Sequence, residues 1–381
     1  MNNDISLKER VEKELSQYSF DSDKGGDKEF IRKQHSDYKK DFINKNKRFW
    51  LENHSLLEES LIDGKKITVE KIRPKLIPIE RLSRGVEGKL FRLARFNWSI
   101  PTSNGFGRRL RFLVWDSYHD ALIGIIGLTD PVFNMKARDE IIGWDRHSRE
   151  EKLVSVLDAF ALGALPPYNQ LLGGKLVASL LMSKDIQKEF SKRYGKSCGI
   201  ISGVKKRPKL ALITTTSVLG RSSVYNRLKL DGKQILEPVG FTSGYGHFHI
   251  NDRLFSELKQ FVLSVEPEKV NSYVFGQGPN WKIRVIREAL KHLGVNQAHV
   301  RHGFRREIFV SKLYDNSIGY LNANEAIGTP LTETTARLGK LAVQRWMINR
   351  ARRDSTYRSF EVKEWIDNIS RECQLDEICE V

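Results

Sequence analysis

Cysteine is scarce in this chain, and its spacing excludes two common uses of the residue. The 381 residues contain three cysteines, Cys198, Cys373 and Cys379, and no two of them form a CxxC pair. A zinc ribbon or a disulfide scaffold is therefore excluded, because both need several cysteines at regular spacing. So few thiols are typical of a reducing compartment, and we expect a cytoplasmic location.

The sequence also lacks the long apolar run that a membrane-spanning helix needs. The apolar run at residues 159–165 ends at Pro166-Pro167, well short of the roughly 20 residues that cross a bilayer. The first residues, MNNDISLKERVEKELSQ, are charged from the start, unlike a secretory signal peptide. We therefore expect no membrane partner.

Positive charge is what the sequence has in excess. Lysine and arginine total 64 against 47 acidic residues, which gives a formal net charge of +17. Hydrophobic residues make up 40% of the chain, a share that suits a folded protein with a sizeable core. Basic side chains that neutralise phosphates release bound counterions, so such a surplus favours a polyanionic partner. We expect that partner to be nucleic acid, and DNA in particular.

The spacing of hydrophobic residues divides the chain into three segments. Residues 1–60 have loosely helical spacing on a lysine-rich surface, which predicts a helical N-terminal arm. Residues 61–250 mix strand and helix patterns and predict an α+β core, whereas residues 251–381 predict a basic, mostly helical C-terminal region. In that last region, helices are expected over 253–263, 281–293, 332–353 and 360–373.

The strand signals lie in the middle segment. Two β-rich runs flank the polar turn Ser117-Tyr118-His119-Asp120 and are typical of a hairpin. Further strands are expected over 152–162, 209–216 and 235–241, with a helix over 171–194. This pattern predicts an α+β fold in which a mixed central sheet is flanked by helices, with helical N- and C-terminal extensions.

A two-glycine turn follows the strand expected over 152–162. It reads Gln170-Leu-Leu-Gly173-Gly174-Lys175 and leads into a helix. Glycines at a helix start let the backbone approach a ligand, and the N–H groups and helix dipole there favour phosphate. Gln170, Gly173, Gly174 and Lys175 are therefore candidate cofactor-binding residues; the alternative is a tight structural connection.

The order of elements here, hairpin, strand, glycine turn, helix, strand, short helix and strand, resembles the acyl-CoA-binding core of the GNAT acyltransferase superfamily. That family's turn reads Gln/Arg-x-x-Gly-x-Gly/Ala; Gln170 and Gly173 match it, and Lys175 stands where the last small residue belongs. Many members carry a tyrosine that protonates the leaving thiolate, and Tyr225 falls at the matching place. The resemblance implies a GNAT-like core, acyl-CoA as cofactor and Tyr225 as a catalytic acid.

Asp158 is a second candidate catalytic residue, because it interrupts an apolar strand pattern. A buried carboxylate is costly unless it is paired, so Asp158 is either functional or bonded to a neighbour. Arg138 and Asp139 form either a functional pair or a structural salt bridge. His247 and His249 alternate as on one strand face, but no acid or cysteine is spaced to complete a ligand set, so we expect no metal.

Basic residues in two further regions are candidate phosphate contacts. Between residues 67 and 98, basic residues interleave with aromatic ones, a pattern that fits either a nucleic-acid surface or a solvated face above a core. In the C-terminal region arginines follow glycine-rich turns or lie along one helix. The candidates there for nucleic-acid binding are Arg284, Arg287, Arg305, Arg306, Arg345 and Arg350.

Several segments together resemble the DruA family of Druantia systems. They are GLTDPVFNMKARDEIIGW, ALGALPPYNQLLGGKLVA, LITTTSVLGRSSVYNRL, EPVGFTSGYG, FGQGPNWKIRVIREAL and RHGFRREIF, in the family's order over about residues 110 to 310. The resemblance implies a role in bacterial anti-phage defence beside other Druantia components, which include a large helicase-like protein. It implies no particular reaction.

Three functions from different classes are compatible with these observations. The first is a nucleic-acid-binding defence component that acts with the helicase-like partner. The second is an acyl-CoA-dependent enzyme that modifies DNA or protein. The third is a non-enzymatic scaffold of the defence complex, which would need no nucleic acid of its own.

Overall fold

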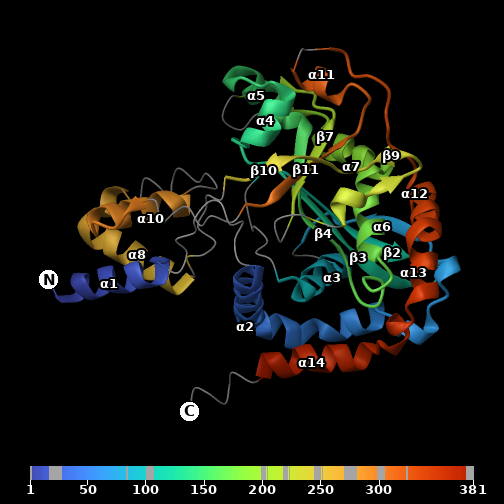
Figure 1. Cartoon of the computed structure of the whole chain (residues 1–381), viewed down its shortest axis with the longest axis horizontal. Coiled ribbons are helices and arrows are strands. Elements are labelled where there is room, and N and C mark those ends of the chain that lie inside the picture. Colours follow the sequence, from blue (N-terminus) through green and yellow to red (C-terminus); the bar gives the residue numbers. More distant parts are fainter. Residues whose placement is uncertain are drawn as a thin grey trace. The chain divides into compact units, whose positions relative to one another are not determined.

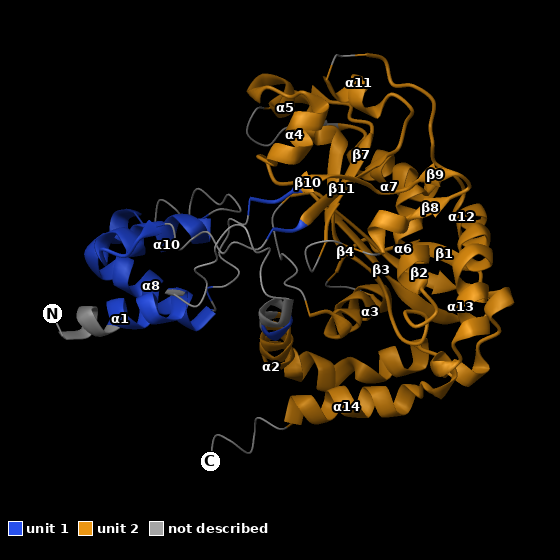
Figure 2. Cartoon of the chain, in the orientation of Figure 1, with its two compact units in different colours: residues 1–34, 103–106, 241–306 blue, residues 35–102, 107–240, 307–381 orange. Residues whose placement is uncertain are grey.

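Packing separates the chain into two compact units. The computed structural model describes residues 2–16, 28–82, 85–99, 107–198, 203, 205–217, 222, 224–243, 250, 252–269, 281–297, 305–322 and 325–374. Unit 1 comprises residues 1–34, 103–106 and 241–306, and unit 2 comprises residues 35–102, 107–240 and 307–381 (Figure 2). Unit 1 is therefore assembled from stretches far apart in the sequence, whereas hydrophobic spacing predicts three consecutive segments.

Unit 2 is built on a seven-stranded sheet in the order β1-β2-β3-β4-β7-β11-β10 (Figure 1). Its strands are β1 Pro74–Pro78, β2 Arg109–Asp116, β3 Ala121–Thr129, β4 Val156–Ala164, β7 Leu212–Thr216, β10 Glu237–Phe241 and β11 Glu307–Lys312. Strands β1 to β4 pair antiparallel, β4 pairs parallel with β7, and β7 pairs antiparallel with β11. The α+β class, the mixed sheet and the β2–β3 hairpin are thus confirmed.

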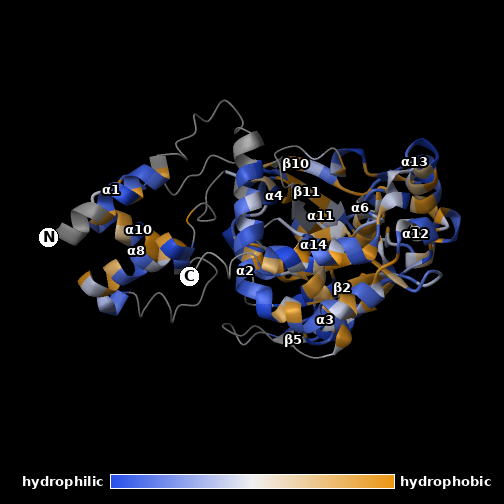
Figure 3. Ribbon diagram, turned by 90° about the horizontal axis from the view of Figure 1, so that it is seen from below, coloured by the Kyte–Doolittle hydropathy of each residue, from blue (hydrophilic) through white to orange (hydrophobic). Residues whose placement is uncertain are grey.

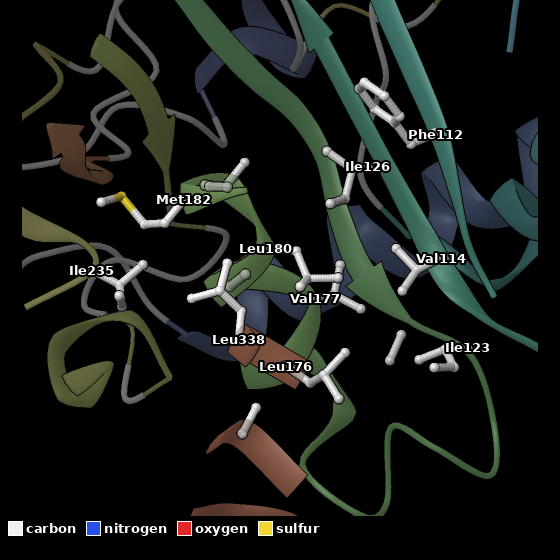
Figure 4. Packing of buried hydrophobic residues seen from close by; sticks show 14 of the residues in the cluster. Phe112, Val114, Ile123, Ile126, Leu176, Val177, Leu180, Met182, Ile235 and Leu338 are labelled. Carbon is white, nitrogen blue, oxygen red and sulfur yellow. The ribbon is translucent and has the colours of Figure 1, made fainter. Parts of the chain in front are cut away.

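One face of the sheet is covered by helices that follow β4 and by a helix close to the C-terminus. These are α6 Gly173–Ser179, α7 Lys184–Tyr194 and α12 Thr335–Ala342; a π-helical turn at Val343–Met347 joins α12 to α13 Ile348–Arg353. Side chains from β2 and β3 meet those of α6 and α12 in one buried apolar cluster (Figure 4). Burial of this apolar area is the main stabilising contribution to the unit.

The opposite face is covered by helices from both ends of the chain. They are α2 Lys28–Ser60, α3 Val86–Ala94 and α14 Val362–Gln374, and their apolar residues share one cluster with β2, β3 and β4. Trp50 of α2 is fully buried and its indole Nε1 donates to the hydroxyl oxygen of Ser370 on α14 at 2.9 Å. Much of the α2 ribbon has a hydrophilic colour in Figure 3.

Smaller elements complete both units. Helices α4 Lys136–Ile142 and α11 Ser317–Asn322 pack beside β7 and β11, and α5 Arg146–Lys152 lies against α11. Two short ribbons pair β5 Ser197–Cys198 with β6 Lys205–Lys206 and β8 Lys229–Leu230 with β9 Lys233–Gln234. In unit 1, α1 Asn2–Ser16, α8 Asp252–Val265 and α10 Trp281–His292 surround a separate apolar cluster. Among the described residues, no helix has the length and apolar character that crossing a bilayer requires.

One predicted helix proves to be two. The helix expected over 171–194 ends at Ser179, and a second helix begins at Lys184 after a short 3-10 turn. The reason is local: Ser183 has an extended backbone, and its hydroxyl accepts from the amide of Asp185, so it caps the second helix. Serine caps compete with helix continuation, and hydrophobic spacing alone does not reveal the break.

The contact between α2 and α14 gives a test of the packing. We expect Trp50→Ala to lower the free energy of unfolding by about 3–5 kcal/mol, because it removes a fully buried aromatic side chain and strands the Ser370 hydroxyl. Leu51→Ala is the matched control: Leu51 is the next residue but is 44% exposed, so it should change stability by no more than about 0.5 kcal/mol. Urea unfolding of both variants checks this, and equal losses would contradict the packing described.

Candidate functional site

A pocket lies where two neighbouring strands part. Strands β4 and β7 pair in parallel only over Val156–Asp158 and Leu212–Thr214. Beyond this pairing the Thr215 hydroxyl of β7 still donates to the carbonyl oxygen of Ala159 at 3.1 Å, but the backbone of β4 continues to Ala164 without pairing with β7. A pocket of about 260 Å³ lies between the strands. It is lined by Asn97, Trp98, Ser99, Ala159, Phe160, Leu162, Gly163, Ala164, Thr215, Thr216 and Tyr225.

A β-bulge shapes the pocket wall. Gly127 pairs with Ala161 and Leu128 with Ala159, so Phe160 is the extra residue on β4. A Cβ on Gly127 would lie 2.5 Å from the Phe160 ring, so glycine is required for the ring to rest there. Gly163 is constrained likewise, since its Cβ would lie 2.8 Å from Trp98. Bulges interrupt the hydrogen bonds of a sheet and are frequent beside active sites.

Tyr225 contributes the pocket's titratable group. It begins a short 3-10 helix, and its ring packs edge-on against Phe309 with centroids 5.4 Å apart. Burial raises the pKa of its phenol to about 12, so the group stays protonated near neutral pH and is able to donate a proton. The structure thus places the predicted catalytic tyrosine in a pocket.

Asp158, the other predicted catalytic residue, is not among the residues that line this pocket. The hydroxyl of Thr214 on β7 donates to its carboxylate at 2.6 Å, and burial raises the pKa of Asp158 to about 6 despite that hydrogen bond and the charge of Arg138. Asp158 is therefore bonded to a neighbour, one of the two outcomes considered for it. It ties β4 to β7 at the last pair before the strands part.

The two glycines of the turn have different environments. The amide of Gly173 donates to the carbonyl of Tyr168 at 2.8 Å, and a Cβ on Gly173 would lie 2.5 Å from that same oxygen. Gly173 is therefore needed by the turn itself, which is also held by a 3.0 Å hydrogen bond from the Tyr168 hydroxyl to the buried Asp116. A Cβ on Gly174 would meet no neighbouring atom within 4 Å, so that side of the turn faces open space.

A group of cations surrounds the turn. Burial and the nearby charges of Arg227 and Arg345 lower the pKa of Lys175, whose ammonium lies 5.5 Å from the ring centroid of Trp346. Arg350 donates from Nε to the carbonyl oxygen of Gln170 at 3.2 Å. The fold therefore brings Gln170, Lys175, Arg345 and Arg350 to one place, although the sequence assigned them to two different sites.

Sequence reasoning missed Arg227 in this group. It lies two residues after Tyr225 in the same 3-10 helix. The sequence offers one signal for Arg227, which is its position two residues after the candidate Tyr225. That Arg227 lies near Lys175 depends on how the 3-10 helix packs, and the sequence does not show this. Repulsion between these cations is reduced when an anion binds among them.

Unit 1 presents Arg284 and Arg287 on one exposed face of α10. They line a pocket of about 400 Å³ together with Glu288 and Gln297. The carboxylate of Glu288 forms an ion pair with Lys269 at 2.8 Å, so its charge is offset within the unit. Both predicted arginines of this helix thus have exposed side chains beside a pocket.

The other predicted groups differ in accessibility. Arg305 is exposed and lies 5.5 Å from the ring centroid of Phe241, whereas Arg306 is half-buried and burial lowers its pKa. His247 and His249 lie outside the described residues.

Arg138 and Asp139 prove to be a structural pair. Arg138 is fully buried; its guanidinium donates to Asp139 at 2.6 Å and to the carbonyl oxygens of Val132 and Phe133 at 2.9 Å. Asp139 also accepts from Arg149 at 2.9 Å. The N–H donors of the Arg138 guanidinium thus have acceptors inside the protein, and the side chain is buried.

The fold and the site therefore define an α+β protein with a pocket at a strand divergence and several cationic groups. Comparison with known proteins identifies the family: residues 25–323 match the family model described as Druantia protein DruA. The chain is also 43% identical over 380 residues to Druantia protein DruA of Escherichia coli (strain UMEA 4076-1), covering 97% of this chain and 93% of the relative. No solved structure matches.

The chain belongs to the DruA family. This membership confirms the resemblance seen in the sequence and assigns the chain to Druantia anti-phage defence.

The raised pKa of Asp158 predicts how stability changes with pH. An acid whose pKa is higher in the folded than in the unfolded state stabilises the fold below its unfolded pKa and loses that contribution as pH rises. For Asp158 the loss runs from about pH 4 to about pH 6. Asp158→Asn still accepts the Thr214 hydrogen bond but does not ionise, so its stability relative to the wild type should increase across this interval. Urea unfolding between pH 4 and pH 7 measures the difference, and a constant difference would contradict the assignment.

Proposed function

We propose that this chain is the nucleic-acid-binding component of its Druantia system and acts there with the other components, including the large helicase-like protein. The observation that carries the proposal is the exposed arginine face of α10. Arg284 and Arg287 lie one turn apart beside a pocket, and the charge of the neighbouring Glu288 is offset by Lys269. Arginine pairs of this kind bind phosphate oxygens through several donors at once.

The net charge supports the same function. A chain with a formal charge of +17 attracts any polyanion over several ångströms before contact is made. Contacts to the phosphate backbone carry no sequence information, and they suit a defence protein that meets many different phage genomes. The scaffold alternative would require neither the exposed arginines nor a salt-dependent affinity.

Charge reversal on α10 tests this proposal. We expect Arg284→Glu with Arg287→Glu to weaken binding to duplex DNA at least tenfold and to lower the slope of log affinity against log salt by about two units, because each lost phosphate contact removes about one. Fluorescence anisotropy over a range of KCl concentrations measures both quantities.

The matched control for this test reverses the same charge elsewhere. Lys188 and Lys192 are exposed on α7 of unit 2, and Lys188→Glu with Lys192→Glu should retain most of the affinity. Equal binding by the α10 variant and the wild type would remove α10 from the interface. No detectable binding by the wild type would favour the scaffold function instead.

A second candidate function is acyl transfer from a coenzyme A thioester, and Tyr225 is the observation that favours it. Its phenol lies in the pocket between β4 and β7, and the structure gives its hydroxyl no hydrogen-bond partner among the described residues. The element order around the pocket supports this candidate through its resemblance to the GNAT core, and the cations near the Gly174 turn are suited to a pyrophosphate.

In this function the thioester, when bound, supplies the activated acyl group. Tyr225 would hold its proton beside the sulfur and release it as the carbon–sulfur bond breaks and a bond to an acceptor nitrogen forms. The proton lost by the acceptor amine would return to the phenolate through solvent. Lys175 and Arg345 would hold the phosphates.

Two substitutions separate this candidate from a purely structural pocket. Gly174→Val projects into open space and should leave the melting temperature unchanged while it weakens acetyl-CoA binding more than tenfold, because the added side chain blocks approach of the pyrophosphate. Tyr225→Phe should keep affinity for acetyl-CoA and abolish protection against phage. Calorimetric titration and a plaque assay check the two effects. Full protection by both variants would leave the turn as a connection and Tyr225 as a packing residue.

A further inference from the structure

Four arginines of unit 2 form a row on the face of the sheet that α3 covers. Arg92 lies on α3, Arg95 directly follows it, and Arg109 and Arg111 alternate along β2. Each guanidinium lies over an aromatic ring. The distances to the ring centroids are 3.6 Å for Arg92 over Phe49, 5.1 Å for Arg95 over Phe42, 4.9 Å for Arg109 over Phe160 and 6.0 Å for Arg111 over Phe91.

Three of the four arginines have no acidic partner among the described residues. Within the part of the chain that the structure describes, no carboxylate forms an ion pair with Arg92, Arg95 or Arg111, and Asp130, whose charge acts on Arg109, is itself held by Arg108 at 2.7 Å. Burial lowers the pKa of all four arginines, and the charges of neighbouring arginines lower it further for Arg95, Arg109 and Arg111. Such a group of like charges costs folding free energy in the absence of an anion.

One hydrogen-bond donor in the row, on Arg95, is also unused. The Nε–H of Arg95 is buried and has no hydrogen-bond partner among the described residues. Leaving a charged donor unsatisfied inside a protein is unfavourable. The N–H donors of a guanidinium lie in its plane, so a guanidinium stacked on an aromatic ring can still donate hydrogen bonds from its edge. Phosphate oxygens are acceptors that match this geometry.

The row ends at the pocket between β4 and β7. The ring beneath Arg109 belongs to Phe160, the bulge residue in the pocket wall. Arg95 begins the 3-10 turn that ends at Asn97, and both Asn97 and Trp98 line the pocket. An extended anion bound along the arginines would therefore reach the pocket that Tyr225 lines.

We infer that Arg92, Arg95, Arg109 and Arg111 bind the phosphodiester backbone of a nucleic acid and bring that strand to the pocket at the β4–β7 divergence. The inference rests on the proposed function and extends it with a second, separate contact surface. A linear series of cations suits a polymer with regularly spaced charges, whereas a single phosphate needs donors that converge on one point.

The test replaces Arg92, Arg95 and Arg111 with glutamine in the full-length chain and measures binding to labelled duplex and single-stranded DNA over a range of KCl concentrations. We expect affinity to fall at least tenfold and the salt slope to fall by about three units. The matched control is Lys184→Gln with Lys188→Gln and Lys192→Gln, which removes the same charge from the exposed face of α7 and should leave binding nearly unchanged.

A conservative triple variant guards against loss of folding. Replacing the same three arginines with lysine keeps the charge but removes the planar fork, so affinity should fall less and the salt slope should be retained. Melting temperatures accompany both measurements, and we expect neither variant to melt below the wild type by more than the α7 control does, because the substitutions to glutamine also relieve repulsion.

The outcomes distinguish this inference from the proposed function. If the wild type binds no DNA, the proposed function fails. If the wild type binds and both arginine-row variants bind equally well, the inference fails alone. Retention of DNA affinity with loss of coenzyme A affinity in the glutamine variant would assign the row to a coenzyme phosphate, and it would overturn the inference as well.

Discussion

The hydrogen bond from Thr214 to Asp158 marks the point on which the functional architecture depends. It joins β4 to β7 at the last parallel pair, and the backbone pairing ends there; one further hydrogen bond, from the Thr215 hydroxyl to the carbonyl oxygen of Ala159, follows before the strands separate. A continuous sheet at this position would leave no space between the strands. Because they part, backbone groups of β4, the bulge at Phe160 and the phenol of Tyr225 border one pocket. The glycine turn, which follows β4 directly, is placed by the same strand.

Groups of neighbouring cations are the second organising feature. They occur around the glycine turn, along the arginine row of α3 and β2, and on α10. Like charges held close together oppose folding through mutual repulsion, and such groups are candidates for a functional site. The buried pair Arg138 and Asp139 shows the contrast, since there the guanidinium is satisfied within the chain.

Local patterns in the sequence predict many of the helices and strands of the fold. The hairpin, the strands β4, β7 and β10 and the helices of the C-terminal region follow from hydrophobic spacing, because each element buries a regular face. The break at Ser183 was missed since one capping hydroxyl decides it. The assembly of unit 1 from α1, α8 and α10 was missed because it depends on contacts between residues more than two hundred positions apart.

The sequence predicted several residues of the candidate site, but it did not predict which of them lie together in the fold. Tyr225 was found through a family resemblance, and the structure puts it in a pocket; Asp158 was predicted to be catalytic as well, yet only Tyr225 lines that pocket. Lys175 and Arg345, which the sequence placed in different sites, prove to be neighbours. Of the arginine row, the sequence singled out only Arg92 and Arg95, within residues 67–98, and left open whether that region is a nucleic-acid surface or a solvated face. The row itself was not predictable, because Arg109 and Arg111 and the aromatic rings of Phe42, Phe49 and Phe160 lie on other elements.

We propose that nucleic acid lies against these groups of cations. Photochemical crosslinking of the full-length chain to DNA with reactive groups on its backbone, followed by mass spectrometry of the peptides, tests it most directly. We expect crosslinks in the α3–β2 region around Arg92 to Arg111 and in α10 around Arg284 and Arg287. Crosslinks confined to other regions, or none above the level given by an unrelated acidic protein, would contradict it.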